Sequence, residues 1–130
     1  MSFPSQNYQS VTGVIDYDPA ADEVYPLWCV PQACEIKAVK YTVANDVAAS
    51  TANYFTVTTY NGGAAGTATT TMGSAVGGTA GWTGLTPKEA SLVAAQINPA
   101  AGDVITASYD ETGTGTFGVL TWQIDYIMGT

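Results

Sequence analysis

Residues 117–128, FGVLTWQIDYIM, carry the clearest structural pattern in the chain. Large apolar side chains occupy every second position: Leu120, Trp122, Ile124, Tyr126 and Met128. Polar side chains alternate with them: Thr121, Gln123 and Asp125. Because successive side chains of a strand point to opposite sides of a sheet, this alternation predicts a long strand with one buried face. We expect this final strand to lie in the middle of an antiparallel sheet.

Length and composition favour one all-β domain. A chain of 130 residues can bury roughly two-thirds of the surface that its unfolded form exposes, which is enough for one hydrophobic core. Only 11% of the residues are charged, and the abundance of Gly, Thr and aromatic residues is typical of short strands joined by turns. We assign residues 1–10 to a polar N-terminal arm and residues 11–130 to a single β-sandwich domain.

The charge balance excludes several classes of partner. Eleven acidic residues stand against three lysines, without arginine or histidine, which gives a formal net charge of −8. Such a surface repels phosphate backbones and anionic lipids, so we expect neither nucleic acid nor a membrane as a partner. The first ten residues lack the features of a secretory signal, and no segment approaches the ~20 apolar residues of a membrane span. We expect a soluble protein made in the cytoplasm.

Cys29 and Cys34 are the only cysteines. Joined, they would close a short loop and add roughly 2 kcal/mol of stability. Unjoined, they would pack as small hydrophobic side chains, and synthesis in the cytoplasm favours this free form. A zinc site would require two further soft ligands, which a chain without histidine does not supply, so we expect no metal site.

The first half of the chain contains four predicted strands: residues 11–17, 24–30, 33–43 and 54–60. Pro26 cannot donate a hydrogen bond to a neighbouring strand, so the second strand either lies at a sheet edge or ends near Pro26. In the third strand the alternation of apolar and polar side chains shifts by one residue at Ala38 and Val39, which predicts a β-bulge. The fourth strand alternates cleanly and ends at residues 61–63 (NGG), which suit a tight turn.

The second half of the chain is less regular. In residues 64–84, which are rich in Gly, Ala and Thr, we expect a short strand within residues 67–72 and then a loop docked through Trp82. Residues 86–89 (TPKE) match a capping box with proline at the first helical position. This match allows a helix over residues 88–97. Against it, Val93, Ala95 and Ile97 alternate with their neighbours as in a strand, so we expect one helical turn followed by a strand that ends near Ile97.

A further strand at residues 103–109, a flexible turn at residues 110–116 and the final strand complete the chain. About eight strands separated by turns are typical of an antiparallel two-sheet sandwich, and we expect a jelly-roll-like one. The chain does not show the alternation of strands and helices that would indicate a parallel sheet. Five side chains are expected in the core: Ile36, Val57, Ile105, Trp122 and Ile124.

The search for catalytic and ligand-binding residues gives no candidate site. Without histidine, neither a Ser/His/Asp nor a Cys/His arrangement can be built. Asp110 and Glu111 should point apart in an extended segment, whereas a glycosidase needs paired carboxylates. Residues 113–118 are rich in glycine but precede a strand, whereas a phosphate-binding loop precedes a helix. We therefore expect no enzyme activity, no catalytic residues and no cofactor.

Two further features allow more than one interpretation. A cluster of acidic residues consists of Asp16, Asp18, Asp22 and Glu23. It lacks the glycine and terminal glutamate of an EF-hand, so we favour a solvated turn over a calcium loop. Three Trp and eight Tyr could form a sugar-stacking platform, but in a sandwich such residues more often fill the core and subunit contacts.

Five segments between residues 24 and 126 occur in a recognisable order. They are residues 31–36 (PQACEI), 39–43 (VKYTV), 54–63 (YFTVTTYNGG), 101–106 (AGDVIT) and 112–126 (TGTGTFGVLTWQIDY). In this order and spacing the chain resembles the small jelly-roll decoration proteins of tailed bacteriophage heads. The acidic turn at residues 16–23 has no counterpart in that pattern.

The resemblance implies a cement or head-decoration protein, commonly a homotrimer, that binds the major capsid protein on the outer surface of the virion and reinforces the shell. No catalytic residues belong to the family, and its capsid contacts follow no motif that transfers by position, so no interface residue is assigned. One alternative is the receptor-binding tip domain of a phage fibre, whose exposed aromatics would engage host sugars. Another is a carbohydrate-binding module, which normally accompanies an enzyme domain or a secretion signal.

Overall fold

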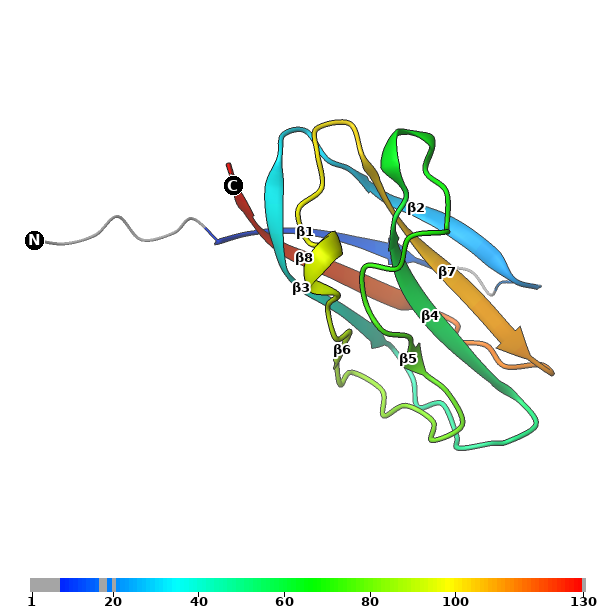
Figure 1. Cartoon of the computed structure of the whole chain (residues 1–130). Helices are drawn as coiled ribbons and strands as arrows, with labels where there is room; N and C mark the ends of the chain where they lie inside the picture. The colour runs from blue at the N-terminus through cyan, green and yellow to red at the C-terminus, as the bar shows by residue number, and fades with distance from the viewer. Residues whose placement is uncertain (1–7, 17–18, 20, 130) are drawn as a thin grey trace, which may run out of the picture.

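Two four-stranded antiparallel sheets pack face to face to form a sandwich (Figure 1). The computed structural model describes residues 8–16, 19 and 21–129. The first sheet, called here the β8 sheet, contains in spatial order β1 (Tyr8–Ile15), β8 (Leu120–Met128), β3 (Cys34–Val43) and β6 (Lys88–Glu89). The second, the β7 sheet, contains β2 (Glu23–Cys29), β7 (Val104–Thr112), β4 (Tyr54–Asn61) and β5 (Val76–Gly77). The all-β, two-sheet prediction is confirmed.

The strands pair in a nested order. β1 pairs with β8, β2 with β7, β3 with β6, and β4 with β5, and every pair is antiparallel. β8 also pairs with β3, and β7 with β4, which completes the two sheets. Of the consecutive strands, only β4 and β5 are neighbours in one sheet, so every other connection crosses between the sheets. This crossing explains why most contacts join residues far apart in the chain.

β8 occupies the interior position that its sequence predicts. It lies between β1 and β3, and its side chains alternate between a buried and a more exposed face. Leu120, Trp122 and Ile124 are buried, while Thr121 is exposed. The strand begins at Leu120 and not at Phe117, because Phe117 turns into an aromatic cluster with Phe55 and Tyr109 before the ladder starts.

Two irregularities in the ladders match the sequence pattern. The register of β3 against β8 shifts between Ile36 and Ala38, and Ala38 and Val39 are consecutive buried residues. The predicted bulge is therefore confirmed to within one residue. Pro26 lies in β2, which is an edge strand, and a second register shift follows between Pro26 and Trp28.

Several strand boundaries differ from the predicted ones. β1 begins at Tyr8, opposite Ile127, so the strand includes three residues that we assigned to the N-terminal arm. It ends at Ile15, and Tyr17 and Asp18 lie outside the described residues, as do residues 1–7 of the arm. β7 continues to Thr112, into the segment expected to be a flexible turn, because its last residues pair with the start of β4.

Three local predictions are wrong. In place of a strand within residues 67–72 there is an isolated bridge from Thr71 to Tyr60, and the short strand that follows is β5. Residues 86–89 do not form a helical turn, because Lys88 and Glu89 form β6 instead. The strand expected to follow and to end near Ile97 is also wrong, because Ala94–Gln96 form a 3₁₀ turn there. The pairing of β6 with β3 supplies backbone partners that override the capping-box pattern.

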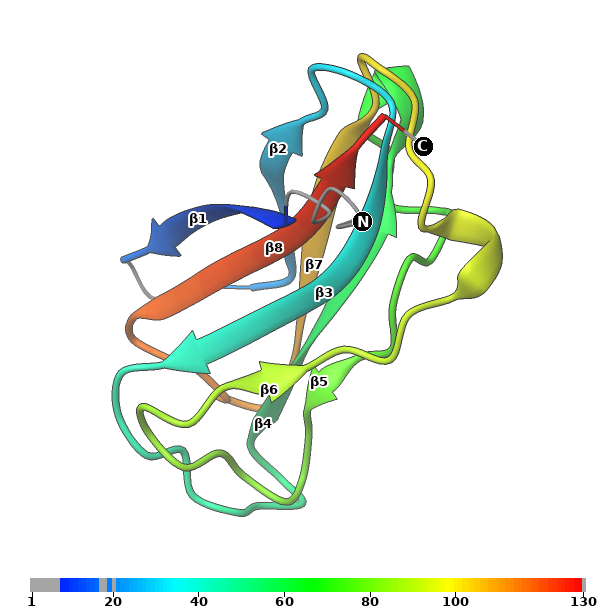
Figure 2. The ribbon, with the colours of Figure 1, turned by 90° about the vertical axis from the view of Figure 1, so that its left-hand side faces the viewer.

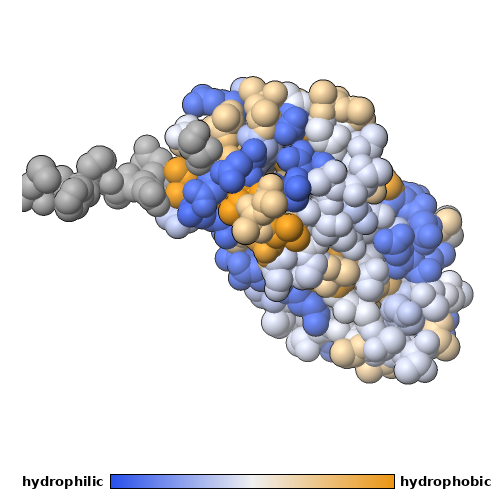
Figure 3. All heavy atoms as spheres, viewed as in Figure 1, coloured by the Kyte–Doolittle hydropathy of each residue, from blue (hydrophilic) through white to orange (hydrophobic). Residues whose placement is uncertain are grey.

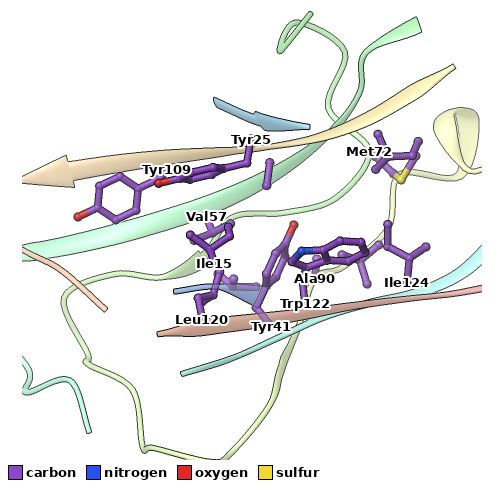
Figure 4. Close-up of a cluster of buried hydrophobic side chains, with 14 of the residues drawn as sticks. Ile15, Tyr25, Tyr41, Val57, Met72, Ala90, Tyr109, Leu120, Trp122 and Ile124 are labelled. Atoms are coloured by element: carbon purple, nitrogen blue, oxygen red, sulfur yellow. The ribbon is translucent and has the colours of Figure 1, made fainter. Parts of the chain in front are cut away.

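The core fills the space between the sheets, as Figure 4 shows for Tyr41 and Trp122 on one side and Tyr25 and Tyr109 on the other. All five side chains that we expected there are buried: Ile36, Val57, Ile105, Trp122 and Ile124. Trp82 is 4% exposed and packs on Phe55, which confirms the docked loop.

Both cysteines are free thiols, in agreement with the favoured alternative. Cys29 is exposed on β2, whereas Cys34 is fully buried at the start of β3, and burial raises the pKa of its thiol. No helix in the described part of the chain is long and apolar enough to cross a membrane.

Candidate functional site

Two hollows on the described surface involve β1. The first, called here the polar basin, has a volume of about 300 Å³ and lies on the outer face of the β8 sheet, which Figure 2 turns toward the viewer. Its lining residues are Thr12, Lys40, Thr42, Pro87, Thr121, Trp122 and Gln123. The second, called here the edge cleft, has a volume of about 280 Å³ and lies where β1 and β2 form adjacent edges of the two sheets.

The polar basin follows from the register of three strands. Thr12 of β1 lies opposite Gln123 of β8, and Gln123 lies opposite Lys40 of β3. In the next row Thr121 lies opposite Thr42. The short threonine side chains leave a hollow that the longer side chains of Lys40 and Gln123 border. The basin therefore exists because short side chains lie next to longer ones on the solvated face of the sheet.

Asp125 organises the polar groups at one end of this face. Its Oδ1 accepts hydrogen bonds from Ser10 Oγ at 2.6 Å and Gln123 Nε2 at 2.8 Å, and Lys40 Nζ lies 3.7 Å from its Oδ2. Partial desolvation pushes the pKa of this carboxyl up, but the two hydrogen bonds and the Lys40 ammonium outweigh it, so the pKa is lowered. Asp125 is thus held ionised, and it fixes the positions of Gln123 and Lys40 beside the basin.

The edge cleft is mainly apolar. Its lining residues are Gly13, Val14, Ile15, Asp16, Tyr25, Pro26, Leu27 and Trp122. Gly13 lies opposite Trp122, and a Cβ at position 13 would overlap the indole ring. Glycine is therefore required here for the ring to lie flat against β1.

Exposed apolar side chains flank the edge cleft. Val14 on β1 is 59% exposed and Val24 on β2 is 50% exposed. We call these two edge strands with their exposed valines the β1/β2 margin. Figure 3 shows a different view, of a face on which hydrophobic residues form small separate patches among hydrophilic ones.

The acidic candidates that the structure describes do not converge on a site, and Asp18 lies outside the described residues. Asp110 is exposed on the outer face of β7, whereas Glu111 lies on the opposite side and accepts a hydrogen bond from the Tyr109 hydroxyl at 3.2 Å. Asp22 Oδ1 accepts from the backbone N–H of Glu111 at 2.9 Å, a structural contact. Among the described residues, no group of three or more His, Cys, Asp or Glu side chains could hold a metal ion.

The three tryptophans do not form a broad exposed platform. Trp82 and Trp122 are buried, and Trp28 is half-buried, with its ring centroid 4.6 Å from that of Tyr126. The glycine-rich segment after β7 forms a turn, with positive φ at Gly113 and Gly118, before β8. Both observations agree with the interpretations that we favoured from the sequence.

Sequence reasoning missed the polar basin. The alternation within β8 and β3 placed Thr121, Gln123 and Lys40 on polar faces, which is what any half-solvated strand would show. Their convergence depends on the pairing of β1 with β8 and β8 with β3, which joins residues about 80 to 110 positions apart. No local signal in the sequence could have found it.

No family model, no curated protein and no solved structure matches this chain.

Proposed function

We propose that this protein is a structural component of a bacteriophage virion that decorates and stabilises the outer surface of the capsid as a homotrimer. The observation that carries the proposal is the nested strand order, in which β1 pairs with β8, β2 with β7, β3 with β6 and β4 with β5. This order is expected of a jelly roll, an architecture that occurs in viral capsid proteins.

The segments that carry the family resemblance supply further support. Residues 31–36 and 39–43 form the entry and body of β3, and residues 54–63 form β4 with its turn. Residues 112–126 form the β7–β8 connection and most of β8. The resemblance therefore concentrates on the interior strands that define the sandwich, and a fold alone does not determine a function.

The proposed trimer is supported by the β1/β2 margin. Among the described residues, Asp16 is the only charged one that lines the edge cleft; Val14 exposes apolar surface in its lining, and Val24 exposes apolar surface on the outer face of β2. Each interface of a cyclic trimer joins two different patches of neighbouring subunits, so the apolar surface of this margin would be covered by an adjoining surface of the next subunit. The interface would then depend on apolar burial, as a chain without arginine requires.

The proposal is tested by mixing the purified protein with mature, expanded capsids that lack it, followed by sedimentation and electron microscopy. We expect regular density on the capsid surface, a trimeric mass in solution and greater resistance of the capsids to heat. Occupancy should change little between about 50 and about 200 mM salt, because only exposed charge pairs are strongly screened.

Two variants make the test sharper. Val14→Asp should weaken the trimer and capsid binding, whereas Val93→Asp, the same change at an exposed valine four residues beyond β6, should not. Density on fibre tips with none on heads, or binding to host glycans with none to capsids, would favour the receptor-binding alternative. A loss of occupancy of about tenfold over the salt range above would contradict the apolar interface.

A further inference from the structure

We infer that the polar basin on the outer face of the β8 sheet is a binding site for a neutral saccharide unit. This inference rests on hydroxyl and amide groups that the proposed capsid role does not use, although Thr12 of β1 belongs to both the basin and the β1/β2 margin. It combines a hollow of about 300 Å³, near the lower end of the roughly 300–1,000 Å³ range of small-molecule pockets, with lining groups that can both donate and accept hydrogen bonds.

The hydrogen-bonding groups of the basin match a ligand rich in hydroxyls. Thr12, Thr42 and Thr121 each offer a hydroxyl, which can donate and accept, and Gln123 offers an amide with both roles. The Thr121 hydroxyl makes one long contact, 3.4 Å to the carbonyl oxygen of Thr42. In the described part of the chain the hydroxyls of Thr12 and Thr42 make no hydrogen bond to protein. Sugar hydroxyls likewise combine both roles, whereas ionised carboxylates and dianionic phosphate esters only accept.

The charges around the basin favour a neutral ligand. Lys40 is the only cationic side chain in the lining, and its ammonium group lies 3.7 Å from Asp125 Oδ2. Glu89 lies opposite Lys40 on β6 and adds a further negative charge to the same row. With a net charge of −8 for the whole chain, the surroundings repel anionic groups.

The apolar surface in the basin is limited but suitably placed. Pro87 contributes a rigid ring to the lining, and the three threonines contribute methyl groups as well as hydroxyls. These groups can contact the C–H face of a pyranose ring while the hydroxyls bond its edge. Because the hollow is open to solvent and the aromatic residue in its lining, Trp122, has its ring buried in the core (Figure 4), we expect a dissociation constant on the order of 1–10 mM for a single sugar ring.

The inference is tested by NMR titration of the ¹⁵N-labelled full chain with D-glucose, D-galactose, D-mannose and N-acetyl-D-glucosamine, each up to about 50 mM, several times the expected dissociation constant. We expect saturable shifts with at least one sugar, at the amides of Thr12, Thr42, Thr121 and Gln123. The double variant Thr42→Val/Thr121→Val keeps the shape of both side chains and removes two hydroxyls. It should bind at least fivefold more weakly.

Thr58→Val is the matched control, since Thr58 is partly exposed on the outer face of the other sheet. It should bind as the unchanged protein does. Thr12→Val, on an edge strand, provides a second measurement if the double variant does not fold. The inference is overturned if none of the four sugars gives saturable shifts, or if the shifts map away from the basin. It is also overturned if Thr58→Val loses as much affinity as the double variant, or if inorganic phosphate binds there as tightly.

Discussion

The two lateral margins of the sandwich are built in opposite ways. At one margin β1 and β2 are edge strands of 8 and 7 residues, and they expose Val14 and Val24. At the other margin β5 and β6 contain 2 residues each. Figure 2 shows these two short strands beside each other, with long connecting loops around them. The lengths of the edge strands therefore differ greatly between the two margins.

The β5/β6 margin is closed by a loop that Trp82 anchors. The indole Nε1 donates to the carbonyl oxygen of Thr86 at 2.8 Å, and Lys88 Nζ lies 5.6 Å from the ring centroid. The backbone of Trp82 also exchanges two hydrogen bonds with Val47, each 2.8 Å long. Short, covered edge strands of this kind do not offer a template for pairing with another chain.

The β1/β2 margin has less protection. Pro26 and the register shift after it make β2 a poor template for a further strand, but β1 contains neither proline nor lysine. The comparison indicates that one margin is sealed within the chain, while the other is suited to contact with a partner. The proposed trimer uses the second margin.

The largest expected effect is the loss of the side chain that supports the β1/β2 margin. Trp122→Ala should lower the free energy of unfolding by about 3–5 kcal/mol, because it opens a large cavity beneath β1. Denaturant unfolding measures the loss, and hydrogen exchange should show that β1 and β2 open first. A loss below about 1 kcal/mol would show that Trp122 does not support this margin.

The matching change at the other margin is Trp82→Ala. We expect a smaller loss, about 3 kcal/mol, because the loop that carries Trp82 can relax into the vacated space. Hydrogen exchange should increase at residues 79–90 while β1 keeps its protection. Faster exchange across both margins would contradict the view that they are independent.

Gly13→Ala tests the close approach of β1 to Trp122. The added methyl group overlaps the indole ring, so we expect a loss of about 1–3 kcal/mol. In the double variant Gly13→Ala/Trp122→Leu the effect of the alanine should nearly vanish, because a smaller side chain lies opposite it. If the stability losses of the two single variants simply add in the double variant, the cause of the Gly13→Ala loss lies elsewhere in β1.

Asp125→Asn should destabilise the protein by up to about 1 kcal/mol at pH 7, since the carboxylate accepts two hydrogen bonds on a partly exposed face. The pKa of Asp125 is lowered from 3.8. The stability from the ionised form is therefore present above pH 3.8 and is lost as the pH falls through the lower folded-state pKa. The melting temperatures of the unchanged protein and of Asp125→Asn should differ at pH 7 and become equal near pH 2. A constant difference would show that the charge is not the cause.

The smallest expected effect concerns Leu85 in the loop of the β5/β6 margin. Its φ is 62° and its side chain is 78% exposed, while its N–H donates to the carbonyl oxygen of Val43 at 2.8 Å. Leu85→Gly should raise the stability by up to about 1 kcal/mol, because glycine adopts positive φ without strain. Leu85→Ala, which keeps the strain, is the control and should leave stability nearly unchanged.

The sequence alone determined the elements whose signal is local. The alternation in residues 117–128 predicted β8 and its buried face, and the slip at Ala38 and Val39 predicted the bulge in β3. Side-chain period and phase are properties of consecutive residues, so they can be read without knowing the partner strand. The same reasoning identified five core residues and limited Pro26 to a sheet edge or a strand end.

Tertiary structure decided everything that depends on which strands pair. Lys88 and Glu89 became a strand because β3 offered backbone partners, although the local pattern favoured a helical turn. β7 extended to Thr112 because β4 lay beside it. The polar basin and the two margins likewise arise from the order of strands in each sheet. That order is set by long-range burial, which no short stretch of sequence encodes.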